Sequence, residues 1–100
     1  MERKVVISKI AERKIAKLFD YLDENWSLKV KSDFIKKLDK HISLIKSYPE
    51  SFPQSQKSPD LRKCVVTKQT TIFFRFTDRE IKILTIFDNR QNPDKLKSEI

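Results

Sequence analysis

Hydrophobic residues recur in steps of three and four over two long stretches in the first half of the chain, residues 10–26 and 30–45. This spacing places apolar side chains along one side of an α-helix, so each stretch predicts an amphipathic helix. Ser8 and Ser27 stand where N-caps belong, and Pro49 ends the second helix. Because almost no residues separate the two stretches, we expect an antiparallel helical hairpin.

In the second half of the chain the spacing of hydrophobic residues is typical of β-strands and no longer of helices. Residues 61–66 are strand-like and residues 71–76 alternate as strands do. Residues 81–87 are apolar on both sides, which is typical of a central strand. A short β-branched run at residues 4–7 predicts a further strand. Residues 68–69 and 77–79 are the expected hairpin turns.

A connection rich in proline and serine, residues 49–60, separates the helices from these later strands. It predicts no regular structure, and Phe52 is its one expected anchor to the core. After the last strand, Asn92 followed by Pro93 resembles a helix start, so we expect a short terminal helix from Pro93 to about Lys97.

The predicted order is β-α-α-β-β-β, an α+β fold in a single domain over residues 1–100. We expect a small antiparallel sheet with the helical hairpin packed on one face, because the apolar stripes of the helices need an apolar partner. The other face of the sheet would then be partly open, and basic residues could collect there.

The charge balance narrows the possible partners. Lys and Arg number 22 against 14 Asp and Glu, a net charge of +8 with a pI of about 9.7. Such an excess indicates an anionic partner, either nucleic acid or an acidic protein. A membrane surface is a weaker candidate, because no Lys/Arg cluster lies beside a strongly apolar helix face with exposed aromatic residues. The sequence shows no signal peptide or membrane span, so we expect a cytoplasmic protein.

Several chemistries are disfavoured by composition. The sequence contains no glycine, which excludes the glycine loops that hold nucleotide phosphates. Cys64 and His41 are the only residues of their kinds; we interpret Cys64 as a small buried thiol and His41 as a residue at the rim of the second helix stripe. We therefore expect no metal site and no cofactor.

The remaining candidates for function are cationic side chains on the strands and the loop that follows them. They are Arg62, Lys63, Lys68, Arg75 and Arg90. Arg75 lies between two phenylalanines, so it either faces solvent or pairs with a carboxylate such as Asp78 or Asp88. Arg90 lies between Asn89 and Gln91, and a guanidinium flanked by amides can hold a phosphate at two points. A plain solvated loop is the alternative for this stretch.

Taken together, the chain resembles the RelE/ParE superfamily, the toxins of bacterial type II toxin–antitoxin modules. The resemblance covers nearly the whole chain and rests on Tyr21-Leu22 and Trp26 in the helical hairpin and on the segments "SYPESFP", "LRKCVV", "TIFFRF" and "ILTIFDNRQNP". It implies growth arrest through an essential target, either DNA gyrase or ribosome-bound mRNA. It also implies neutralisation by an acidic or amphipathic antitoxin segment. We expect the apolar groove beside the helical hairpin, with Phe19, Trp26 and the sheet edge, to accept such a segment.

The resemblance also bears on catalysis. RNA-cleaving members carry an arginine after the last strand, which Arg90 matches, but Thr71 and Leu96 stand near the positions of their early third-strand arginine and terminal tyrosine or histidine. One hypothesis is therefore a ribosome-dependent endoribonuclease in which Arg62, Arg75 and Arg90 hold the phosphate, assisted by Lys63. The other is a non-enzymatic inhibitor that poisons gyrase or another essential target by binding. Lys63, Lys68, Asn89 and Gln91 are the candidate target-binding residues.

A basic nucleic-acid-binding domain without toxicity is the alternative function. The chain offers few aromatic side chains on which single-stranded bases could stack, which disfavours this alternative.

Overall fold

The computed structural model describes residues 3–56, 58–89, 94–97 and 99. The elements in chain order are β1 (Lys4–Ile7), α1 (Lys9–Asn25), α2 (Leu28–Ser47), a 3₁₀ turn η1 (Pro49–Ser51), β2 (Gln54–Ser55), β3 (Ser58–Val65), β4 (Thr70–Phe76), β5 (Glu80–Asp88) and α3 (Asp94–Lys97). The order confirms the α+β fold expected from the sequence.

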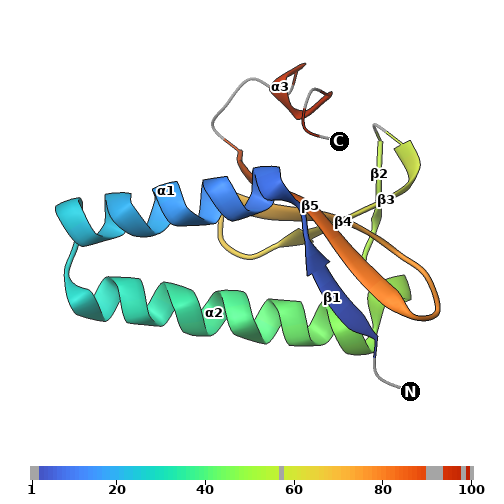
Figure 1. Cartoon of the computed structure of the whole chain (residues 1–100), viewed down its shortest axis with the longest axis horizontal. Coiled ribbons are helices and arrows are strands. Elements are labelled where there is room, and N and C mark those ends of the chain that lie inside the picture. Colours follow the sequence, from blue (N-terminus) through green and yellow to red (C-terminus); the bar gives the residue numbers. More distant parts are fainter. Residues whose placement is uncertain (1–2, 57, 90–93, 98, 100) are drawn as a thin grey trace.

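The two long helices form the predicted hairpin. The Ser8 hydroxyl oxygen accepts a hydrogen bond from the Ala11 amide at 3.1 Å, and the Ser27 hydroxyl oxygen accepts one from the Val30 amide at 3.2 Å. Both predicted N-caps are thus confirmed, and each satisfies a backbone N–H that its helix leaves unpaired. Figure 1 shows α1 and α2 running side by side in opposite directions, with their distal ends projecting beyond the sheet.

The sheet has five strands in the order β1-β5-β4-β3-β2. Strands β2 to β5 are antiparallel neighbours, whereas β1 pairs with β5 in parallel. The sheet is therefore mixed and not wholly antiparallel as expected. A parallel pair needs a long crossover, and the helical hairpin is part of the chain that separates β1 from β5. The short β2 also falls inside the connection for which no regular structure was expected.

The larger apolar cluster lies between the helical hairpin and one face of the sheet, here called the inner face. Its buried members are Ala11, Leu38, Ile45, Cys64, Val66, Ile72, Phe74, Ile81, Ile83 and Ile86. Phe52 packs against this cluster from the connection, with its ring 5.8 Å from that of Phe74 at 86°. The predicted anchoring role of Phe52 is confirmed.

The opposite face of the sheet, the outer face, is less open than the sequence indicated. Phe73 pairs with Thr85 while Phe74 pairs with Ile83, so Leu84 is the extra residue of a β-bulge. Leu84 joins a second cluster with Leu61, Phe73, Phe87 and Leu96. This second cluster is called the outer-face cluster, and the described residues 94–97 and 99 are called the C-terminal segment. Leu96 belongs to α3, so the C-terminal segment covers part of this face.

The C-terminal helical turn α3 spans Asp94–Lys97. It falls within the range expected for a terminal helix, and the expected start at Pro93 lies outside the described residues. Among the described residues, no helix is both long enough and apolar enough to cross a membrane.

Candidate functional site: a cationic groove beside the helical hairpin

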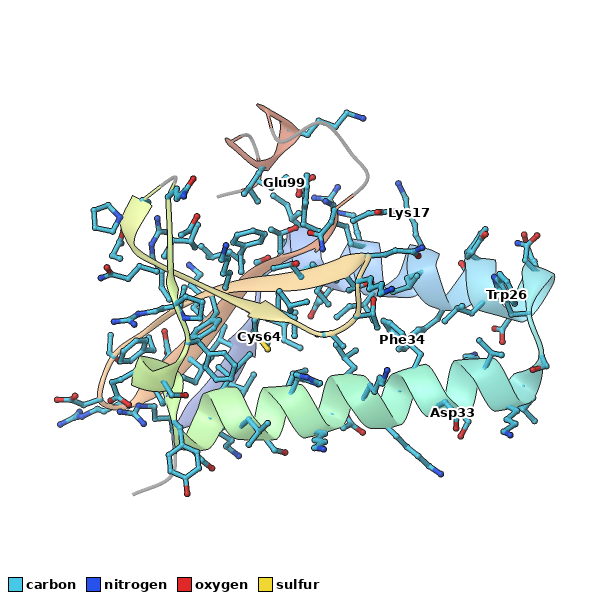
Figure 2. The ribbon with its side chains drawn as sticks, turned by 180° about the vertical axis from the view of Figure 1, so that it is seen from behind. Lys17, Trp26, Asp33, Phe34, Cys64 and Glu99 are labelled. Atoms are coloured by element: carbon cyan, nitrogen blue, oxygen red, sulfur yellow. The ribbon has the colours of Figure 1, made fainter. Side chains whose placement is uncertain are left out.

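A groove of about 1000 Å³ opens where the helical hairpin projects beyond the sheet. Its walls come from α1 and the first half of α2, and its far side from the β3–β4 turn and the end of β5. The lining residues are Lys14, Lys17, Leu18, Tyr21, Leu22, Trp26, Val30, Phe34, Lys37, Thr67, Lys68, Gln69, Thr70, Ile86, Phe87 and Asp88. Figure 2 shows Phe34 on α2 and Trp26 at the distal end of α1, on the two helices that border this space.

The apolar part of the groove is exposed because none of the strands that the structure describes reaches beneath the distal end of the hairpin. Tyr21 is 51% exposed, Trp26 55% and Val30 40%. Deeper in the groove, Leu22 and Phe87 are buried. Large apolar side chains left in solvent side by side indicate a binding surface for another protein.

The polar part of the groove is mostly positive. Among the described residues, Lys14, Lys17, Lys37 and Lys68 line it, against one carboxylate, that of Asp88. Apolar walls bordered by several ammonium groups complement a segment that is itself amphipathic and acidic.

The two aromatic residues predicted to bind the antitoxin lie in different surroundings. Trp26 lines the groove and is exposed. Phe19 is partly buried against the inner-face cluster, with the Lys31 Nζ 5.7 Å from its ring centroid. Phe19 therefore packs against the core, whereas the Trp26 side chain is accessible to a partner.

Arg62 faces the helices and binds the connection that follows α2. It pairs with Phe74 across the β3–β4 ladder, which places it on the inner face. Its Nη1 donates to the carbonyl oxygens of Phe52 at 2.7 Å and Glu50 at 3.2 Å, and its guanidinium carbon lies 5.7 Å from the Phe76 ring centroid. These contacts give Arg62 a structural role.

Arg75 lies on the outer face, because its neighbour Phe74 points into the inner cluster. Its Nε donates to a carboxylate oxygen of Asp60 at 2.7 Å. The expectation that Arg75 pairs with a carboxylate is confirmed, but the partner is Asp60, not Asp78 or Asp88. The Ser58 hydroxyl, which hydrogen-bonds Asp60, lowers the pKa of that carboxyl from 3.8, and Arg75 lowers it further.

The other predicted target contacts are spread along the sheet. Lys63 pairs with Phe73 and therefore shares the outer face with Arg75. Lys68 lines the groove in the β3–β4 turn, and Asn89 braces that turn: its Nδ2 donates to the Lys68 carbonyl oxygen at 3.2 Å. Arg90 and Gln91 lie outside the described residues.

The lone cysteine and histidine have the roles expected of them. Cys64 is 2% exposed, and burial raises the pKa of its thiol from 9.0 to about 11, so it is not a thiolate near neutral pH. His41 is half-buried on α2, with its Nδ1 2.7 Å from the Lys37 carbonyl oxygen.

Sequence reasoning missed most of the groove. Lys14, Lys17 and Lys37 lie on the helices, where a lysine is usually a solvated surface residue. A signal was present, however: Tyr21, Trp26 and Val30 continue the apolar stripes to the ends of the two helices that the connecting turn joins.

Solved structures with the same fold include toxin–antitoxin proteins at low sequence identity. A chain of the chromosomal ParDE toxin–antitoxin system from P. aeruginosa superimposes with a TM-score of 0.71 at 12% identity, over 86% of this chain and 95% of that one. A chain of the E. coli DinJ–YafQ toxin–antitoxin complex gives a TM-score of 0.64 at 13% identity, over 90% and 96%. No curated protein matches the sequence.

The family assignment comes from the sequence itself. Residues 5–93 match the family described as the ParE toxin of the type II toxin–antitoxin system parDE. The match covers β1 from its second residue, the helical hairpin that forms the groove, and strands β2 to β5. The chain therefore belongs to the ParE toxin family and is the toxin of a type II toxin–antitoxin system.

Proposed function

We propose that this toxin arrests growth by binding DNA gyrase, not by cleaving mRNA, and that an acidic amphipathic segment of its antitoxin neutralises it by occupying the groove. The observation that carries the choice of target is the separation of Arg62 and Arg75. They lie on opposite faces of the sheet, and each is already engaged, Arg62 with backbone carbonyl oxygens and Arg75 with Asp60.

Cleavage of RNA by attack of a ribose 2′-hydroxyl needs cations that converge on one phosphate and groups that transfer protons. Arg62 and Arg75 do not converge. The only histidine and both tyrosines of the chain are His41, Tyr21 and Tyr48, and all three belong to the helical hairpin or its C-cap. A toxin that works by binding alone requires neither arrangement, and this supports gyrase over mRNA.

The proposed antitoxin site rests on the groove. The exposed Tyr21, Trp26 and Val30 supply apolar contacts, and four lysines supply positive charge. An amphipathic helix or strand with acidic flanks would cover the exposed apolar side chains and form ion pairs with the lysines. The net charge of +8 would speed the encounter of the two chains.

The target is tested by expressing the toxin from an inducible promoter and assaying purified gyrase with saturating toxin. We expect growth arrest, inhibited DNA supercoiling and full-length transcripts. Normal supercoiling together with newly cleaved mRNA on ribosomes would overturn the proposal in favour of the ribonuclease.

A control variant, Ile45→Asp, separates the effect of the folded toxin from that of a foreign basic protein. Ile45 is fully buried in the inner-face cluster, so a carboxylate at this position should unfold the chain while leaving its composition almost unchanged. Cells expressing this variant should grow normally.

A further inference from the structure

Lys14 lies between the groove and the C-terminal segment and contacts both. It lines the groove, and its Nζ also forms an ion pair with the Glu99 carboxylate of the C-terminal segment. The same ammonium lies 5.3 Å from the ring centroid of Phe87. Phe87 likewise lines the groove and belongs to the outer-face cluster. Lys14 and Phe87 are therefore the boundary between the groove and the region that the C-terminal segment covers.

Glu99 ties the C-terminal segment to the sheet. The hydroxyl of Thr85 donates to Glu99 Oε1 at 2.9 Å, and Thr85 is fully buried on β5. The backbone N–H of Glu99 donates to the Leu96 carbonyl oxygen at 3.0 Å, and Leu96 packs in the outer-face cluster. Figure 2 places Glu99 on the side of the sheet away from α2. One carboxylate thus joins α1, β5 and the C-terminal segment.

We propose that occupancy of the groove by an acidic segment and attachment of the C-terminal segment are coupled through Lys14. The Glu99 carboxylate forms an ion pair with the Lys14 ammonium, and Lys14 also lines the groove. A carboxylate arriving in the groove beside Lys14 weakens the attraction that holds Glu99, and Glu99 in turn weakens the attraction of the groove for that carboxylate. Linkage makes the two effects equal in binding free energy. This inference rests on the proposed antitoxin site.

The consequence is that antitoxin binding loosens the C-terminal segment and begins to uncover the outer-face cluster of Leu61, Phe73, Leu84 and Phe87. The free toxin keeps these side chains covered. The groove and the outer face therefore act as linked surfaces, although none of the described residues 94–97 and 99 lines the groove.

The test uses a synthetic helical peptide with leucines at spacings of three and four and glutamates on the flanking positions. Trp26 is the only tryptophan of the chain and lines the groove, so its fluorescence reports occupancy. Glu99→Gln removes the internal carboxylate charge. We expect this variant to bind the peptide about fivefold more tightly than the wild type, at the lower end of typical coupling between sites.

Glu12→Gln is the matched control, because Glu12 is exposed on α1, does not line the groove and loses the same charge. In the wild type, saturating peptide should also accelerate amide exchange at Glu99, measured by NMR. Equal affinities for the two variants, or an unchanged exchange rate at Glu99, would overturn the coupling.

A peptide that leaves Trp26 fluorescence unchanged in every variant would overturn both the groove as an acidic-segment site and the coupling. Growth arrest and gyrase inhibition are measured without the peptide, so they would be unaffected by that result. Failure of the coupling is therefore distinguishable from failure of the toxin assignment.

Discussion

Arg62 shows how far a single residue can depart from what its sequence neighbours indicate. It was a candidate phosphate contact, yet it joins β3 to the backbone of the connection and lies against Phe76. Arg3 lies 5.6 Å from the same ring centroid and donates to the Thr77 carbonyl oxygen at 2.9 Å. Arg3, just before β1, therefore contacts the end of β4, and Arg62 links the connection to the same end of β4.

Replacing Arg62 should therefore cost stability. Arg62→Ala leaves the Glu50 and Phe52 carbonyl oxygens without their charged donor, and hydrogen bonds to charged groups contribute about 1.5–3 kcal/mol each. We expect the free energy of unfolding in urea to fall by about 2 kcal/mol. Arg75→Ala, which removes only an exposed ion pair, should cost clearly less. Equal losses for the two variants would contradict the structural role of Arg62.

Cys64 makes stability depend on pH in the alkaline range. Its thiol pKa is raised from 9.0 to about 11 by burial, so the folded state holds a proton that the unfolded state releases between these values. Stability from this group is complete below pH 9 and is lost as pH rises toward 11. The total loss is about 2–3 kcal/mol.

Urea unfolding of the wild type and of Cys64→Ala at several pH values between about 8 and 11 isolates this effect. The variant will be less stable at neutral pH because it leaves a small cavity. Its free energy of unfolding should nevertheless fall less steeply with pH than that of the wild type. Parallel curves for the two proteins would show that Cys64 is not the cause.

At the scale of elements, the sequence pattern correctly predicted the features that depend on residues close together in the chain. The strand at residues 4–7, both serine caps and the hairpin turns all follow from neighbours in the sequence, and all were confirmed. The parallel pairing of β1, the bulge at Leu84 and the Arg75–Asp60 pair depend on residues distant in sequence. Periodicity carries no information about such contacts, so these features were missed or assigned other partners.

The projecting hairpin is the element that should carry partner recognition. Trp26→Ala should leave thermal unfolding almost unchanged, because the side chain is more than half exposed. It should weaken antitoxin binding by about 2 kcal/mol, or roughly 30-fold in Kd, as expected for a tryptophan at the centre of an interface.

Tyr48→Ala is the matched control, since Tyr48 is 62% exposed at the far end of α2 and does not line the groove. Calorimetric titration of the antitoxin into each variant gives the comparison. Equal affinities of the two variants would place the antitoxin elsewhere on the toxin.

At the scale of the whole molecule, charge governs encounter more than it governs the fold. A net charge of +8 produces a long-range field that salt screens, with a Debye length of about 10 Å at 0.1 M ionic strength. We expect the association rate with an acidic antitoxin to fall about tenfold or more between about 0.05 and 0.5 M NaCl, while the dissociation rate changes little. Stopped-flow fluorescence of Trp26 measures both, and an association rate independent of salt would exclude electrostatic steering.

Apolar side chains at the distal end of the hairpin are not covered by any strand that the structure describes, so the free toxin has an incomplete hydrophobic core. Its antitoxin would then be a detachable piece of the hydrophobic core as well as an inhibitor. We therefore expect the toxin on its own to self-associate reversibly as its concentration rises, and co-expression with the antitoxin to give a monodisperse, more heat-resistant product.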